Sequence, residues 1–220
     1  MMPEPSLVPT APPSLMDVVA KHGSLSCGYT QDITSNVTIL SGADIADIAH
    51  FLCSLHGGHP SVIDHAANRT SEPLVRDWLV QAIDGFTAER AFITRLTVAA
   101  GPILGLSIED HSNATVVGQR RALEMLSRSD RNGCALGASF ALVLDWLAMR
   151  PLLENIAIKL GIEPHPAILT PAEKTDALGK ELSKSSSMER AINFGVDQLL
   201  AQHRGLWQLL EARRNARQTD

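Results

Sequence analysis

Two long segments of the chain place apolar residues at the spacing of an amphipathic α-helix, and they predict its two longest helices. In 74–100 the apolar positions recur at alternating steps of four and three, which keeps one face of a helix toward a core. The segment 188–214 follows the same rule. One residue in each stripe does not fit, namely Glu89 in the first and His203 in the second. The sequence therefore predicts a carboxylate and an imidazole inside a helical core.

Shorter helices are predicted where a capping residue precedes an apolar pattern. Ser41 is a good N-cap with Asp44 three residues on, and it opens a helix over 41–56 that the Gly57-Gly58 pair ends. Pro60 suits the first turn of a short helix over 60–67.

The second half of the chain carries similar signals. Asn113 is expected to cap a helix over 113–127, after an apolar loop over 101–113. A long helix is predicted over 134–160, with a kink or break at Pro151, where a backbone donor is missing. Thr170 and Glu173 form a capping-box pattern that opens a polar helix ending near Ser183.

These elements predict an all-α fold, a multi-helix bundle of four long helices with short capping helices. Its architecture resembles ferritin-like or haem-oxygenase-like bundles in helix length alone, since no family motif covers the chain. The expected organisation is a disordered Pro-rich tail over 1–15, an irregular segment over 16–40, one bundle domain over 41–214 and a tail over 215–220. Only 4% of residues are aromatic, which favours helix packing through aliphatic side chains.

Charge and composition narrow the classes of partner. A formal net charge of −5 gives no electrostatic basis for binding nucleic acid or anionic lipid. No apolar run reaches the roughly 20 residues that span a bilayer, and the N-terminus lacks the pattern of a secretory signal. The 3 cysteines are far apart and form no CxxC pair, so we expect reduced thiols in a cytoplasmic protein.

Glu89 and His203 lie near the midpoints of their helices, so neighbouring helices would bring them to a similar depth. Asp145 is a third polar residue within an apolar helix, and it lies on a strip of small residues near Pro151. A buried carboxylate needs a partner, because burying an isolated charge is very costly. We therefore expect a contact between Glu89 and His203, within a mid-bundle pocket lined by Phe86, Glu89, Asp145, Trp146, His203 and Trp207.

This pocket admits two readings. In the functional one, Glu89 and His203 are metal ligands, or the acid and base of a small-molecule site. In the structural one they form a satisfied buried hydrogen bond. A ferritin-type di-iron centre is disfavoured, because such bundles use Glu-x-x-His on two helices and this chain has none.

A second candidate is the histidine cluster of His56, His59 and His65. The spacing His-x2-His-x5-His matches no structural zinc pattern. The cluster favours either a ligand or metal site beside the Gly57-Gly58 pair, or ordinary turn and cap chemistry.

Two functions thus remain open from the sequence. One is a bundle that binds a small molecule or a single metal, with or without catalysis. The other is a non-enzymatic regulatory scaffold that works through an exposed apolar face or as a homodimer through its long helices. The sequence names no substrate and no cofactor.

Overall fold

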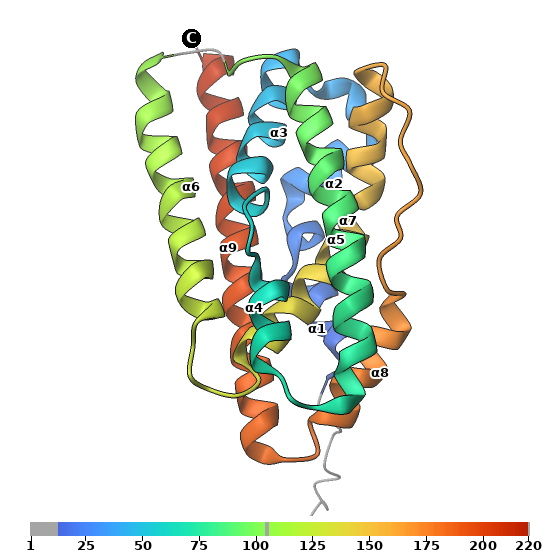
Figure 1. Cartoon of the computed structure of the whole chain (residues 1–220). Coiled ribbons are helices and arrows are strands. Elements are labelled where there is room, and N and C mark those ends of the chain that lie inside the picture. The colour runs from blue at the N-terminus through green and yellow to red at the C-terminus, as the bar shows by residue number, and fades with distance from the viewer. Residues whose placement is uncertain (1–12, 104–105, 220) are drawn as a thin grey trace, which may run out of the picture.

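The computed structural model describes residues 13–103 and 106–219, and within them the chain forms helices and no strand (Figure 1). This confirms the expected all-α class. The helices are α1 (Leu15–His22), α2 (Gly28–Ser35), α3 (Gly42–His56), α4 (Val62–Arg69), α5 (Pro73–Ala100), α6 (Leu106–Ser127), α7 (Cys134–Lys159), α8 (Ala172–Leu182) and α9 (Ser186–Thr219), with short 3-10 turns at η1 (Ser24–Ser26) and η2 (Val37–Ile39).

Helix α7 is the centre of the fold. It packs against α9 along much of its length and also contacts α1, α4, α5, α6 and α8. Its length and composition alone would let it cross a bilayer, with a mean hydropathy of 1.4, but 83% of its most apolar window is buried inside the fold. Packing against neighbouring helices therefore accounts for its apolar surface on nearly every side.

Two glycines allow α7 and α9 to touch through their backbones. A Cβ on Gly137 of α7 would lie 2.1 Å from the Ile192 carbonyl oxygen, and one on Gly195 of α9 would lie 2.1 Å from the Cys134 carbonyl oxygen. No side chain fits at either position, because the obstacle is backbone that cannot move aside. This close crossing fixes the depth at which Asp145 and His203 face each other.

The apolar stripes of α5 and α9 are buried as their spacing predicted, and so are their two polar members. Glu89 is 0% exposed and His203 is 1% exposed. The predicted cap of α3 is also confirmed: the Asp44 backbone N–H donates to Ser41 Oγ at 3.2 Å, and the Ser41 backbone N–H donates to Asp44 Oδ2 at 2.8 Å. Helix α3 ends at His56, as the two glycines indicated.

Several predicted boundaries are wrong in the second half of the chain. Helix α6 begins at Leu106, so residues expected in an apolar loop are helical and Asn113 lies within the helix instead of capping it. Helix α7 continues through Pro151 without a break. The Thr170 hydroxyl does not cap α8, which begins at Ala172, and its oxygen is buried without a hydrogen-bond partner.

The two ends of the chain also differ from expectation. The segment 16–40, predicted to be irregular, contains most of α1, all of α2 and two 3-10 turns. Helix α9 extends to Thr219 in place of the predicted tail over 215–220. Most of the Pro-rich tail over 1–15 lies outside the described residues.

Buried ion pairs fasten the end of α9 to α3. Arg213 donates from Nε to Asp47 Oδ2 at 2.8 Å and from Nη2 to Asp47 Oδ1 at 3.0 Å. Arg217 donates to Asp47 and to Asp44, at 2.6 Å each. These bonds to Arg217, together with those from Ser41, lower the pKa of Asp44 despite its partial burial. They explain why the helix continues where the apolar pattern stops.

Candidate functional site

A fully buried carboxylate of the core, Asp145 on α7, is 0% exposed and accepts three hydrogen bonds. Its Oδ1 accepts a hydrogen bond from the Ser24 backbone N–H at 2.8 Å, and its Oδ2 accepts one from Ser24 Oγ at 2.5 Å. Ser24 belongs to η1, which the preceding turn at Gly23 brings against α7. A Cβ on Gly23 would lie 2.3 Å from Asp145 Oδ1, so only glycine lets the backbone approach this closely.

A third hydrogen bond joins Asp145 to His203 on α9. His203 Nδ1 lies 2.5 Å from Asp145 Oδ2. Because an ionised carboxylate only accepts, the proton of this bond sits on Nδ1 of His203. This leaves Nε2 as the free lone pair of the neutral ring, and the Asp145 carboxylate fixes both the tautomer and the orientation of the imidazole.

The far nitrogen of His203 faces a second histidine, His56 at the end of α3. The two Nε2 atoms are 2.8 Å apart and the rings meet edge to face, with centroids 4.9 Å apart. With the lone pair on His203 Nε2, His56 donates from its own Nε2. Asp145, His203 and His56 thus form one continuous chain of hydrogen bonds across three helices.

Aromatic rings pack against His56 and exclude water from most of its surface. Phe86 and Trp146 both meet its imidazole in T-shaped contacts, at centroid distances of 6.1 and 5.8 Å. Burial, and secondarily the positive charge that His203 can carry, lower the pKa of His56 well below 6.5. His56 is therefore neutral near pH 7, and its Nδ1 has no hydrogen-bond partner among the described residues.

His56 also borders a small cleft between α3, α4 and α6. The cleft has a volume of about 40 Å³, and Gly58, Ser61, His65 and Arg120 are among the residues that line it. The Arg120 guanidinium lies over the backbone of Gly58, where an added Cβ would be 3.0 Å from Nη2. One end of the hydrogen-bonded chain thus adjoins a small cleft at the surface.

Glu89 belongs to a separate network. Its Oε2 accepts from Trp146 Nε1 at 2.9 Å and from Arg150 Nε at 2.8 Å, while its Oε1 is buried with no partner. Arg150 also donates to the Glu154 carboxylate at 2.9 Å and to the His165 carbonyl oxygen at 2.8 Å. The guanidinium carbon lies 4.1 Å from the centroid of a phenylalanine ring on α5, Phe92.

The expected contact between Glu89 and His203 is therefore wrong. Each residue is drawn inward as predicted, but Glu89 takes Arg150 as its partner and His203 takes Asp145. Trp146 lies between the two networks: it donates to Glu89 and touches the ring of His56. The physical reason is charge, because a buried carboxylate is better compensated by a guanidinium than by a neutral imidazole.

The remaining predicted pocket residues are buried but not all belong to one site. Phe86 packs on Trp146 with ring centroids 5.1 Å apart. Trp207 packs instead near Tyr29, at 6.4 Å between centroids, and its Nε1 has no hydrogen-bond partner among the described residues. The six residues that we expected to line a pocket are all buried in the core, and His56, which lies beside them, borders a small cleft.

The histidine cluster does not form as a unit. His56 points into the core, whereas the side chain of His59 is 67% exposed and pairs with Asp64 at 3.2 Å. His65 is half-buried at the edge of the cleft. Within 13–103 and 106–219, no three histidine, cysteine or carboxylate side chains are arranged to hold a metal ion.

The sequence analysis missed three features of these buried networks: Ser24, Arg150 and the hydrogen bond between His56 and His203. Arg150 had a usable signal, because with Asp145 it is one of only two charged residues in the apolar stretch from Cys134 to Leu153. A buried cation on the central helix is the natural partner for Glu89. Ser24 had no such signal, because its role depends on a turn whose position only the fold determines.

The sequence over residues 19–218 matches the family of unknown function DUF6975, and the chain belongs to that family. No curated protein and no solved structure matches it. The resemblance to ferritin-like or haem-oxygenase-like bundles therefore stays a prediction, as does a cytoplasmic location.

Proposed function

We propose that this member of the DUF6975 family binds the ionisable end of a small molecule at the His56 cleft and exchanges a proton with it. One observation carries the proposal: an unbroken chain of hydrogen bonds, Asp145–His203–His56, runs from a buried carboxylate to a residue that borders an opening. Carboxylate-oriented imidazoles of this kind serve as general acids and bases.

The chain of hydrogen bonds moves a proton inward without leaving charge on His56. His56 accepts a proton at Nδ1 from a group in the cleft and passes its Nε2 proton to Nε2 of His203. The positive charge then rests on His203, beside the negative carboxylate of Asp145. Reversal of both transfers returns the proton to the cleft. His56 is neutral before and after, which suits its lowered pKa.

The size and charge of the cleft indicate what enters it. At about 40 Å³ it has room for only a few waters, so only an end group of a ligand fits. Arg120 at the rim is paired with Glu124, which also lines the cleft, so a carboxylic acid would take the place of this exposed carboxylate on the guanidinium. A metal-binding role for the core is not supported, because no three potential ligands are arranged to hold a metal ion within the described residues.

A structural role is the second candidate, and the burial of the network favours it. Asp145 is 0% exposed, His203 1% and His56 5%, and Ser24 saturates the far side of the carboxylate. A fully satisfied polar network of this kind can specify a unique packing of α3, α7 and α9 without any ligand.

Formate is a suitable probe, since it is the smallest carboxylate. In protein labelled with ¹⁵N-histidine, formate added at pH 7 is expected to shift the ring resonances of His56 and, through the shared hydrogen bond, those of His203. The variant Arg120→Gln should weaken this response about threefold to tenfold, as expected for loss of one charge-assisted contact. The matched variant Arg121→Gln, on an exposed residue outside the cleft, should leave it unchanged.

Either of two results contradicts the proposal. One is that neither ring responds to formate in protein that remains folded. The other is an equal response in the Arg120→Gln and Arg121→Gln variants. The structural candidate would then account for the network.

A further inference from the structure

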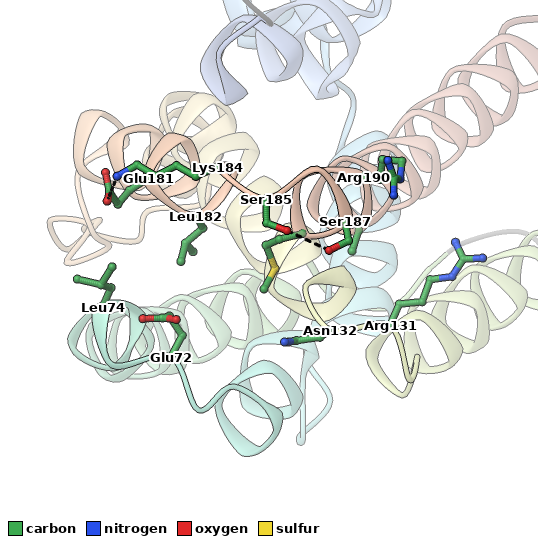
Figure 2. A pocket seen from close by; sticks show the side chains of 12 residues that line it. Glu72, Leu74, Arg131, Asn132, Glu181, Leu182, Lys184, Ser185, Ser187 and Arg190 are labelled. Atoms are coloured by element: carbon green, nitrogen blue, oxygen red, sulfur yellow. Dashed lines mark hydrogen bonds and ion pairs between the residues drawn. The ribbon is translucent and has the colours of Figure 1, made fainter.

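A large hollow of the described surface lies at the opposite end of α9 from the ion pairs with α3. It has a volume of about 740 Å³ and is formed by the start of α5, the turn before α7, and the junction of α8 with α9 (Figure 2). Small-molecule sites in proteins commonly occupy about 300–1,000 Å³. This hollow, which we call the basal groove, is separate from the His56 cleft and shares no lining residue with it.

The floor of the basal groove is apolar. Leu74, Leu182, Met188 and Ala191 line it, and Leu74 remains 58% exposed although it sits in a concave surface. Figure 2 shows Leu74 and Leu182 on one side of the groove and the Ser185–Ser187 hydrogen bond above its middle. A hollow with exposed aliphatic walls gains free energy when an apolar chain covers them.

Charge is distributed unevenly around the rim. Arg131 and Arg190 extend at the same end of the groove, and neither forms an ion pair with a carboxylate among the described residues (Figure 2). Arg131 instead lies over the Phe194 ring, 5.5 Å from its centroid. At the other end Lys184 is paired with Glu181, and Glu72 adds a negative charge beside Leu74, so the positive charge of the groove is confined to the end with the two arginines (Figure 2).

We propose that the basal groove binds a small molecule with an unbranched aliphatic body and one carboxylate, such as a medium-chain fatty acid. The body lies along Leu74, Leu182 and Met188, and the carboxylate meets Arg131 and Arg190. An apolar body alone explains neither the two arginines nor their position at one end. An anionic headgroup with a contiguous apolar tail matches both features.

Decanoate tests this inference by isothermal titration calorimetry with the full chain, below the concentration at which decanoate forms micelles. We expect saturable binding, at least tenfold weaker binding of the uncharged comparator 1-decanol, and binding weakened about threefold to fivefold by Arg190→Gln. The substitution Leu74→Ser should weaken binding by a similar factor, because it removes exposed apolar surface from the groove.

Matched controls separate the groove from general surface effects. Arg121→Gln removes the same charge outside the groove, and Val98→Ser removes an aliphatic side chain that is 77% exposed on the far end of α5. Both should bind decanoate as the unsubstituted chain does. Because all four residues are exposed or lie on the rim, folding should be preserved.

Four results overturn the inference. The first is no binding of decanoate at millimolar concentration. The second is equal affinity for decanoate and 1-decanol, and the third is equal weakening by the groove and control variants. Binding to vesicles of anionic phospholipid in the absence of binding to monomeric decanoate would also contradict it, because it would assign the arginines to a membrane surface.

Discussion

Removing the guanidinium of Arg150 should destabilise the fold by several kcal/mol. Arg150 is 3% exposed and donates three hydrogen bonds, one of them to Glu89, which is 0% exposed. In Arg150→Met the Glu89 carboxylate stays buried without its cation. Breaking a buried pair in this way costs about 3–5 kcal/mol, a large part of the 5–15 kcal/mol by which a typical domain is stable.

The companion change Glu89→Gln should lower the free energy of unfolding by about 1.5–3 kcal/mol, which is the contribution of a hydrogen bond to a charged group. Its amide oxygen can still accept from Trp146 Nε1, but the buried Arg150 loses its main negative partner. In the double variant neither charge is left unpaired at this position. We therefore expect the double variant to cost about 2 kcal/mol less than the sum of the two single changes.

Urea unfolding followed by far-ultraviolet circular dichroism measures all three variants. Tryptophan fluorescence is unsuitable, because both Glu89 and Arg150 lie around Trp146. The exposed pair Arg120–Glu124 on α6 is the matched control, and its coupling should be below about 0.5 kcal/mol. If the Glu89 and Arg150 costs add to within about 0.5 kcal/mol, the pair is not coupled and our assignment of Glu89 to a structural network is wrong.

Three further predictions follow from the fold. Because the pKa of His56 is held well below 6.5 in the folded chain, His56 takes up a proton on unfolding below that pH. The free energy of unfolding should therefore fall with decreasing pH, by up to about 1.4 kcal/mol per pH unit. His56→Gln should flatten this dependence in urea titrations from pH 7 to 5. Gly137→Ala should cost about 3 kcal/mol or more by separating α7 from α9, whereas Gly118→Ala, with open space around its Cβ, should raise the melting temperature slightly. Asp47→Ala should speed tryptic cleavage near the end of α9, because Arg213 loses this carboxylate; cleavage at the unsubstituted rate would contradict it.

The class of the fold was predictable because helical periodicity reports burial directly. The stripes of α5 and α9 are buried at the positions that their spacing gave, including Glu89 and His203. The ends of the helices were harder to predict, because tertiary contacts extend helices beyond the capping and apolar patterns in the sequence. Helix α9 runs to Thr219 because Arg217 finds Asp44 and Asp47 on α3, which no local pattern reveals.

The sequence predicted which residues of the candidate site are buried, but not which of them form hydrogen-bonded pairs. Periodicity showed that Glu89, Asp145 and His203 lie inward, yet it carries no information on which helix faces which. His56 was singled out for its neighbours in sequence, whereas its partner lies 147 residues away. Such pairings depend on the angle and depth of the α7–α9 crossing, which the backbone contacts at Gly137 and Gly195 determine.

The positions of the protons on His56 and His203 test the central claim most directly. Long-range ¹H–¹⁵N correlation spectra of the ¹⁵N-histidine-labelled chain at pH 8 report which ring nitrogens are protonated. We predict a proton on Nδ1 of His203, a lone pair on its Nε2, and a proton on Nε2 of His56, with the order reversed in Asp145→Asn because the amide donates to Nδ1. A proton on Nε2 of His203 in the unsubstituted chain at that pH, or the same order in the Asp145→Asn variant, would contradict the proton-exchange account.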